Sequence, residues 1–68
     1  MKNNIKIERA RHSMTQADLA EKAQVSRQTI NAMEAGKYVP STLLSLKLAD
    51  LFKVEVSELF QLEKGDWK

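Results

Sequence analysis

The chain contains no cysteine, a single histidine, one proline and two glycines among its 68 residues. Without cysteine it can form neither disulfide bonds nor thiolate metal sites. His12 alone makes no recognisable zinc site, and its neighbours Arg11 and Ser13 are not acids that could orient it for catalysis. The sequence also has no glycine-rich phosphate loop, internal repeat or low-complexity tract. We therefore expect no enzymatic activity, no metal site and no cofactor.

Long apolar segments are absent as well. No apolar run approaches the roughly 20 residues of a transmembrane helix, and no segment resembles a signal peptide, so we expect a soluble, cytoplasmic protein. A chain of 68 residues should form one domain that buries only about 60% of its unfolded surface, and oligomerisation would support it. The net charge of +2 and isoelectric point near 9.1 are only weak evidence for a nucleic-acid partner.

The clearest local pattern begins at Thr15. Its hydroxyl can accept a hydrogen bond from the first helical turn, and Asp18 can return one to the backbone, which is a capping box with aspartate in place of glutamate. This pattern predicts a helix that starts at Gln16. The apolar residues of the segment fall on one helical face, which we expect to be buried. They are Leu19, Ala20 and Ala23.

A second helix is predicted over residues 27–35. Gln24 and Val25 break the first pattern, and Ser26 is a strong N-terminal cap. Gly36 suits the left-handed position that ends many helices. The residues expected to close against the first helix are Val25, Ile30 and Met33, and the small Ala20 allows a close crossing.

Polar side chains lie on or near the outer face of this second helix. Arginine pairs with guanine, and glutamine or asparagine pairs with adenine, through two hydrogen bonds each in the major groove of DNA. The candidate base contacts are therefore Arg27, Gln28 and Asn31, with Thr29 beside them. Gln16 and Ser26 stand at helix N-termini, which favour phosphate. The alternative is a small helical bundle whose polar face is merely solvated.

Several segments together resemble a known family. T-Q-A-D-L-A, V-S-R-Q-T-I, the G-K-Y-V-P-S loop and L-K-L-A-D-L-F are similar to those of Cro/cI-type helix-turn-helix regulators, also called the xenobiotic-response-element family. The resemblance covers residues 3–60. It implies an all-α, five-helix lambda-repressor-like domain over residues 1–68 that binds double-stranded DNA. In some short relatives a tail comparable to residues 61–68 is extended.

The first helix is expected from Ile5 to His12, capped by Asn3 or Asn4, with Ile5 and Ala10 facing inward and Ser13 ending it. Glu8 stands where the family often has a large apolar residue. Either Ile7 replaces that residue through a rotated helix, or Glu8 has a partner. The resemblance also implies a structural ion pair between Arg9 and Glu34; the alternative is two solvated charges.

Beyond Gly36, Lys37 and Tyr38 are expected beside the second predicted helix of the motif, where an ammonium and a phenol can reach phosphates. The alternative is a solvated Lys37 and a Tyr38 packed on its loop. Ser41 or Thr42 caps the next helix, which we expect to be buried on most sides. Its apolar residues are Leu43, Leu44, Leu46, Leu48, Ala49, Leu51 and Phe52.

A short fifth helix, capped by Ser57, follows. Its apolar residues exceed what a core of this size needs, so some should contact a second subunit. The predicted dimer interface comprises Val56, Leu59, Phe60 and Leu62, with Val54 nearby. Leu62 could instead belong to a frayed terminus. For Trp67 both an interface position and disorder stay open.

The sequence therefore predicts a homodimeric, sequence-specific transcriptional regulator, most simply a repressor, with no small-molecule ligand or membrane partner. Two copies of the recognition helix would enter successive major grooves about 34 Å apart on an inverted repeat. Thr29 could touch a phosphate or a thymine methyl group. The alternative is a protein-interaction or antitoxin-type module with the same fold. The residues do not distinguish repression from activation, nor identify the operator.

Overall fold

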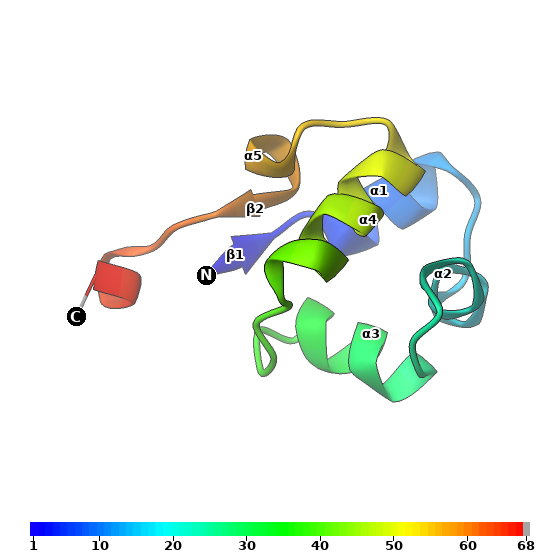
Figure 1. Ribbon diagram of the computed structural model, residues 1–68, viewed down its shortest axis with the longest axis horizontal. Coiled ribbons are helices and arrows are strands. Elements are labelled where there is room, and N and C mark those ends of the chain that lie inside the picture. Colours follow the sequence, from blue (N-terminus) through cyan, green and yellow to red (C-terminus); the bar gives the residue numbers. More distant parts are fainter. Residues whose placement is uncertain (68) are drawn as a thin grey trace.

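Helix α4 crosses the middle of the molecule, and the other helices pack around it (Figure 1). The computed structural model describes residues 1–67. Its elements are β1 (Lys2–Asn3), α1 (Ile5–Arg11), α2 (Gln16–Ala23), α3 (Arg27–Glu34), α4 (Thr42–Phe52), α5 (Val56–Leu59), β2 (Phe60–Gln61) and the 3-10 helix η1 (Lys64–Trp67). The predicted all-α, five-helix fold is confirmed, with a pair of two-residue strands added.

The core lies between α4 and the other four helices. Its fully buried large side chains are Ile5, Leu19, Ile30, Met33, Leu48, Phe52 and Leu59. The predicted burial of the apolar faces of α2 and α3 is confirmed, including the small Ala20 and Ala23. Val25 packs against the core from the turn between these helices. This packing fixes α3 at the edge of the domain (Figure 1).

Helix α2 begins with the predicted capping box. The Asp18 amide donates to the Thr15 hydroxyl over 3.0 Å, and the Thr15 amide donates to the Asp18 carboxylate over 2.9 Å. The bond from the Thr15 amide lowers the pKa of Asp18, because it favours the ionised carboxylate. Helix α2 ends at Ala23, and its C-terminal cap, Gln24, adopts the left-handed conformation with φ 61°. That residue turns the chain into α3.

Helix α3 ends one residue earlier than predicted, because Ala35 is its C-terminal cap. Gly36 then takes φ 75°. The Gly36 amide donates to the Met33 carbonyl over 3.0 Å, and the Lys37 amide donates to the Ala32 carbonyl over 2.9 Å. This pair of bonds is a Schellman motif, which satisfies carbonyls at the helix end and directs the chain away from α3.

Helix α1 differs from the prediction in its inward face. It ends at Arg11, and Ala10 is exposed rather than buried. Glu8 is buried instead and lies 3.3 Å from an Arg11 guanidinium nitrogen. Ile7 is exposed, so a partnered Glu8 is the alternative that the structure supports. Of the two candidate caps, Asn4 occupies the cap position, while the Asn3 side chain accepts from the Ile5 amide.

Two predictions about the C-terminal helices were wrong. Helix α4, capped by Ser41, is not buried on most sides, because Leu43 and Leu46 are 69% and 54% exposed. Helix α5 is capped by Glu55 rather than Ser57. The Glu55 amide donates to the Glu58 carboxylate over 3.1 Å, which places the start of the helix before Ser57. No helix within residues 1–67 is long and apolar enough to cross a membrane.

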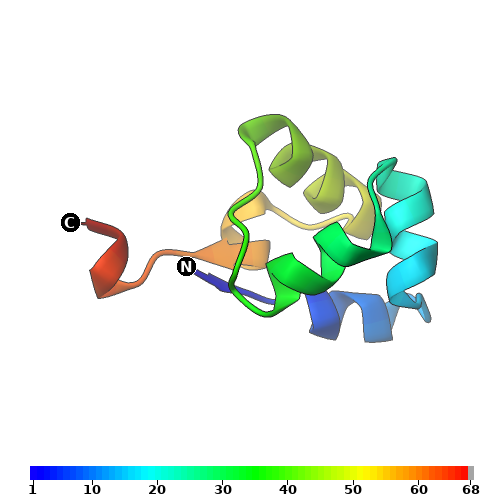
Figure 2. The same ribbon diagram turned by 90° about the horizontal axis from the view of Figure 1, so that it is seen from below.

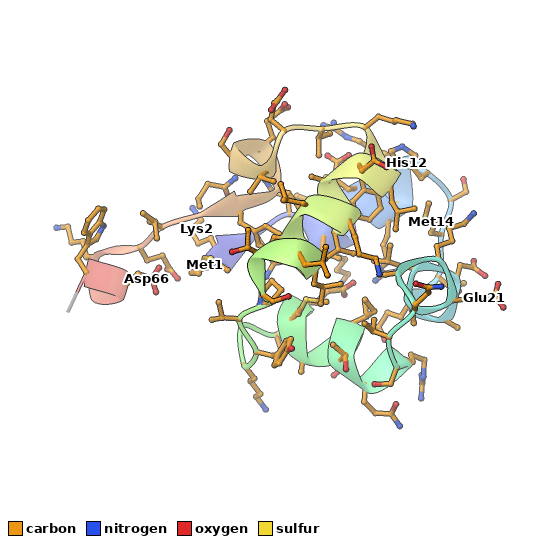
Figure 3. The ribbon with its side chains drawn as sticks, viewed as in Figure 1. Met1, Lys2, His12, Met14, Glu21 and Asp66 are labelled. Carbon is orange, nitrogen blue, oxygen red and sulfur yellow. The ribbon has the colours of Figure 1, made fainter. Side chains whose placement is uncertain are left out.

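The two ends of the chain lie side by side. Strands β1 and β2 pair antiparallel, with Lys2 opposite Gln61 and Asn3 opposite Phe60. The following segment, including η1, extends away from the helices (Figure 1). The Met1 amino group contacts Glu63 over 3.0 Å and Asp66 over 3.1 Å, which raises the pKa of that amino group. Met1 and Asp66 are labelled in Figure 3. The last residue of the predicted tail, Lys68, lies outside the described residues.

Candidate nucleic-acid interface

Four polar side chains line one open hollow beside α3. The hollow has a volume of about 290 Å³ and is lined by Gln16, Arg27, Gln28 and Asn31. The last three are the predicted base contacts, and all are exposed. They lie on a helix at the outer edge of the domain, with α2 at one end and the loop to α4 at the other (Figure 2). The fold therefore brings these donors and acceptors together where a large ligand can reach them.

The N-terminus of α3 is closed by Ser26 and Thr29. The Ser26 hydroxyl accepts from the Thr29 amide over 3.1 Å and lies 2.9 Å from the Thr29 hydroxyl. One hydroxyl donates to the other, so the second hydroxyl hydrogen is left for an outside acceptor. The first turn of α3 contains no acidic residue. Its free backbone amides and the positive end of the helix dipole favour an anion here.

Gln16 is hydrogen-bonded to two residues in the C-terminal half of α3. Its side-chain nitrogen donates to a Glu34 carboxylate oxygen over 3.2 Å, and its side-chain oxygen accepts from the Asn31 amide over 3.5 Å. These bonds span 18 and 15 positions of the sequence, respectively. The crossing of α2 and α3 makes them possible, and sequence reasoning did not anticipate them.

Arg9 and Glu34 form the ion pair that the family resemblance implied. The guanidinium donates twice to the carboxylate, over 2.6 and 3.0 Å, and once to the Met14 carbonyl over 3.0 Å. The two side chains are only 14% and 10% exposed. Such a paired geometry is among the strongest hydrogen-bonded arrangements between side chains. It fastens the C-terminal end of α3 to α1.

The charge on Glu34 is stabilised despite its burial. Burial by itself raises the pKa of Glu34, but hydrogen bonds from Arg9 and Gln16, with the positive charges of Arg9 and Lys6, outweigh it and hold the pKa below its ordinary value. The hydrogen bond to Glu34 likewise raises the pKa of Arg9. Both groups are therefore ionised at neutral pH, and the carboxylate acts only as an acceptor.

Lys37 and Tyr38 lie in the loop that follows α3. Both are exposed, and the exposed fraction of Tyr38 is 46%. They are at the opposite end of α3 from Arg27 (Figure 2). His12 lies on the far side of the domain from α3, with its ring 5.5 Å from that of Phe52 (Figure 3). The candidate DNA face is thus separate from the lone histidine.

The predicted dimer residues do not share one environment. Leu59 is completely buried in the core of the monomer, so its predicted place in a dimer interface was wrong. Val56 and Phe60 line a mainly apolar hollow of about 210 Å³, whose other walls are Met1, Val39, Pro40, Thr42, Ser45 and Leu46. Leu62 is 62% exposed. The exposed Val39 and Leu46, which sequence reasoning assigned to no interface, extend this apolar face.

Comparison with known proteins identifies the family. A family model described as helix-turn-helix matches residues 5–59, from α1 to α5. An uncharacterized HTH-type transcriptional regulator of Methanocaldococcus jannaschii is 52% identical over 66 residues, which cover 97% of this chain and 100% of that protein. The uncharacterized HTH-type transcriptional regulator YgzD of Bacillus subtilis is 45% identical over 64 residues, covering 94% of this chain and 97% of YgzD.

An uncharacterized HTH-type transcriptional regulator of Methanothermobacter thermautotrophicus is 37% identical over 69 residues, which cover 100% of this chain and 100% of that protein. The similarity in each case spans the helices that carry Gln16, Arg27 and Asn31, and not a short motif alone. With a family match over most of its length and relatives of the same size, the chain belongs to the Cro/cI-type helix-turn-helix family.

Proposed function

We propose that this protein is a sequence-specific, DNA-binding transcriptional regulator that acts as a homodimeric repressor on an inverted-repeat operator in the cytoplasm. The observation that carries the proposal is the exposed hollow on α3, where Arg27, Gln28 and Asn31 gather beside Gln16. These side chains offer the hydrogen-bonding groups that base edges of the major groove require. The names of the relatives as transcriptional regulators support the same function.

In this proposal the side chains divide into two roles. Arg27 reads guanine, while Gln28 and Asn31 read adenine. The contacts to the sugar-phosphate backbone come from Gln16, Ser26, Thr29, Lys37 and Tyr38. Their positions at both ends of α3 support this division, because a helix held by phosphates at each end has a defined register in the groove.

The homodimer is proposed to form through the apolar face of Val56, Phe60 and Leu62, extended by Val39 and Leu46. The hollow in this face is lined by no charged side chain, although charged residues make up 29% of the chain. Depletion of charge is typical of interface centres. A two-fold axis would bring the same face of each subunit together, and the two α3 helices would then enter major grooves about 34 Å apart.

Selection of binding sites from a random duplex library, with purified protein at near-physiological salt, tests the proposal. Enrichment of an inverted repeat with half-sites about one helical turn apart is the expected result. A lone half-site would leave DNA reading intact and contradict the dimer geometry. If no sequence is enriched and only salt-sensitive background binding remains, the protein-interaction alternative replaces DNA reading, since binding to phosphates alone carries no sequence preference.

A transcription assay separates repression from the activation alternative. The enriched site would be placed over a promoter, where a bound dimer excludes the polymerase and lowers transcript yield. The matched control is the same template with the site scrambled. Unchanged or increased transcription from the intact site would contradict the repressor assignment while leaving DNA binding standing.

A further inference from the structure

A chain of side-chain hydrogen bonds runs from the interior of the domain to its DNA face. Arg9 donates to Glu34 over 2.6 and 3.0 Å, Gln16 donates to Glu34 over 3.2 Å, and Asn31 donates to Gln16 over 3.5 Å. The first two residues are largely buried and the last is exposed. The state of a buried carboxylate is thereby connected to a proposed base-reading side chain.

The carboxylate fixes the direction of the Gln16 amide. An ionised glutamate offers only acceptors, whereas a glutamine amide has a donor end and an acceptor end. The NH₂ group of Gln16 must therefore face Glu34, because the reverse orientation would place the Gln16 oxygen against a carboxylate oxygen. With its NH₂ group directed at Glu34, Gln16 presents its carbonyl oxygen to Asn31.

That oxygen in turn fixes the direction of Asn31. To meet an acceptor, Asn31 must present its own NH₂ group, and one of the two hydrogens is used in the bond to Gln16. What is left for a ligand is the second N–H and Oδ1 itself. Asn31 therefore offers one donor and one acceptor to the hollow on α3.

This pair matches one purine and not the other. In the major groove adenine presents an acceptor at N7 and a donor at its amino group, while guanine presents acceptors at both N7 and O6. Against guanine the Asn31 oxygen would face O6, and its remaining N–H could satisfy only one of the two acceptors. The fixed amide is thus complementary to adenine and mismatched to guanine.

We propose that Glu34, acting through Gln16, is a positioning residue that locks Asn31 in the orientation that selects adenine over guanine. The inference deepens the proposed function and rests on it, since it assumes that Asn31 meets a base. It gives Gln16 a task beyond a phosphate contact. It also gives the buried ion pair a part in base preference as well as in stability.

The test uses binding-site selection with the full-length protein and four variants. Asn31→Ala first identifies the base pair that Asn31 reads, as the one position whose preference it abolishes. Gln16→Met removes the link between Glu34 and Asn31 without touching the ion pair. Arg9→Gln with Glu34→Gln replaces the carboxylate by an amide, which can donate or accept, and leaves no charge stranded. Lys37→Ala is the control for loss of a phosphate contact.

Dissociation constants are then measured for duplexes with adenine or guanine at that position. The wild type should prefer adenine by roughly 5-fold to 150-fold, the range that a good bidentate contact gives. Gln16→Met should reduce this ratio to less than about one third of its wild-type value, since a freed amide can turn its NH₂ group toward guanine. The Arg9→Gln/Glu34→Gln variant should reduce it in the same direction. Lys37→Ala should weaken both duplexes equally, as a phosphate contact carries no base information.

The inference fails if guanine is preferred at the Asn31 position, or if Gln16→Met leaves the adenine-to-guanine ratio unchanged. A ratio that falls in Gln16→Met but not in the Arg9→Gln/Glu34→Gln variant overturns the role of Glu34. The position read by Gln28 is an internal control, whose preference should stay constant. Failure of the wild type to select any sequence overturns the proposed function as well, so the two failures are distinct.

Discussion

The polar face of α3 and the apolar face around α4 and α5 are built on different principles. At the polar face, Gln16 of α2 and Asn31 of α3 are held by directional hydrogen bonds that lead back to a buried ion pair. On the other face, Val39 and Leu46 are exposed, and their side chains have no group that could form such bonds. A face made of donors and acceptors can be arranged within one subunit before its ligand arrives. An apolar face gains stability only when a partner removes it from water.

The two faces should therefore fail in different ways. Damage to the support of α3 should appear in the isolated subunit, whereas damage to the apolar face should appear only in assembly.

Arg9→Met should have the largest effect, because it leaves the Glu34 carboxylate buried without its partner. Breaking a buried pair by removing one member costs about 3–5 kcal/mol of unfolding free energy. Urea denaturation followed by circular dichroism measures the loss. Lys22→Met, which removes an exposed cation of α2, is the matched control and should change stability by less than about 0.5 kcal/mol. An Arg9→Met protein as stable as the control would mean that the ion pair contributes nothing to the unfolding free energy.

Leu46→Asp should dissociate the proposed dimer and spare the fold. Leu46 is 54% exposed and lines the apolar hollow, so a carboxylate there stays solvated in the monomer but would be desolvated at an interface. We expect a loss of about 2 kcal/mol or more in dimerisation, as for an interface hot spot. Sedimentation equilibrium measures it. Leu43→Asp is the control, since Leu43 is on the same helix but does not line the hollow; equal effects would place the interface elsewhere.

Arg27→Ala should weaken the preferred DNA site by about 1–3 kcal/mol and relax selectivity at one base pair. The reason is the loss of a bidentate contact to guanine, which only that sequence position can supply. Competition binding against single-base variants of the selected site measures the effect. A uniform loss on every variant would show that Arg27 contacts phosphate and not a base.

Lys37→Ala should have a smaller and different effect. It should weaken binding to all sequences alike and reduce the slope of log affinity against log salt concentration by about one unit, because one phosphate contact is lost. Affinities measured at several salt concentrations test this. A loss of affinity that depends on the DNA sequence would mean that Lys37 contacts bases rather than phosphates. It would contradict the backbone role proposed for Lys37.

Much of this architecture follows from local chemistry and was therefore predictable. Thr15 with Asp18, Ser26 and Gly36 mark the limits of α2 and α3 through caps whose partners lie within a few residues. The exposure of Arg27 follows from the same helical register. These features depend on residues that are close in sequence, so they can be predicted from the sequence pattern.

What was missed depends on packing between distant segments. The apolar positions of α4 cover more than one stripe, so the pattern could not show that Leu43 and Leu46 would be left exposed. The sequence did not show that α5 would place Leu59 in the core rather than at a subunit interface. The bonds from Gln16 to Glu34 and Asn31 arise only where two helices cross. The left-handed conformation of Gln24 could not be predicted from the sequence either, because no glycine stands at that position.

Acidification should have the smallest effect, a loss of the unfolding free energy that the ionised Glu34 contributes at the polar face. The pKa of Glu34 is lower in the folded protein than in the unfolded chain, where it is about 4.3. The folded state therefore gains stability from this carboxylate above about pH 5, and loses it as the pH falls through the lower, folded-state pKa.

The expected outcome is a steeper loss of unfolding free energy between about pH 5 and pH 2 in the wild type than in the Arg9→Met/Glu34→Met variant. Asp18 and Asp66 also have lowered pKa values and are present in both proteins, so they contribute equally and cancel in the comparison. Leu46→Asp cannot serve as the reference, because it adds a titrating group. Denaturation by urea at a series of pH values, with protein dilute enough to be monomeric, measures the difference. Parallel curves would mean that Glu34 is not held in its charged form by Arg9 and Gln16. The charge of Glu34 would then add nothing to the support of α3, and the polar face would no longer differ from the apolar face by its dependence on an ionised group.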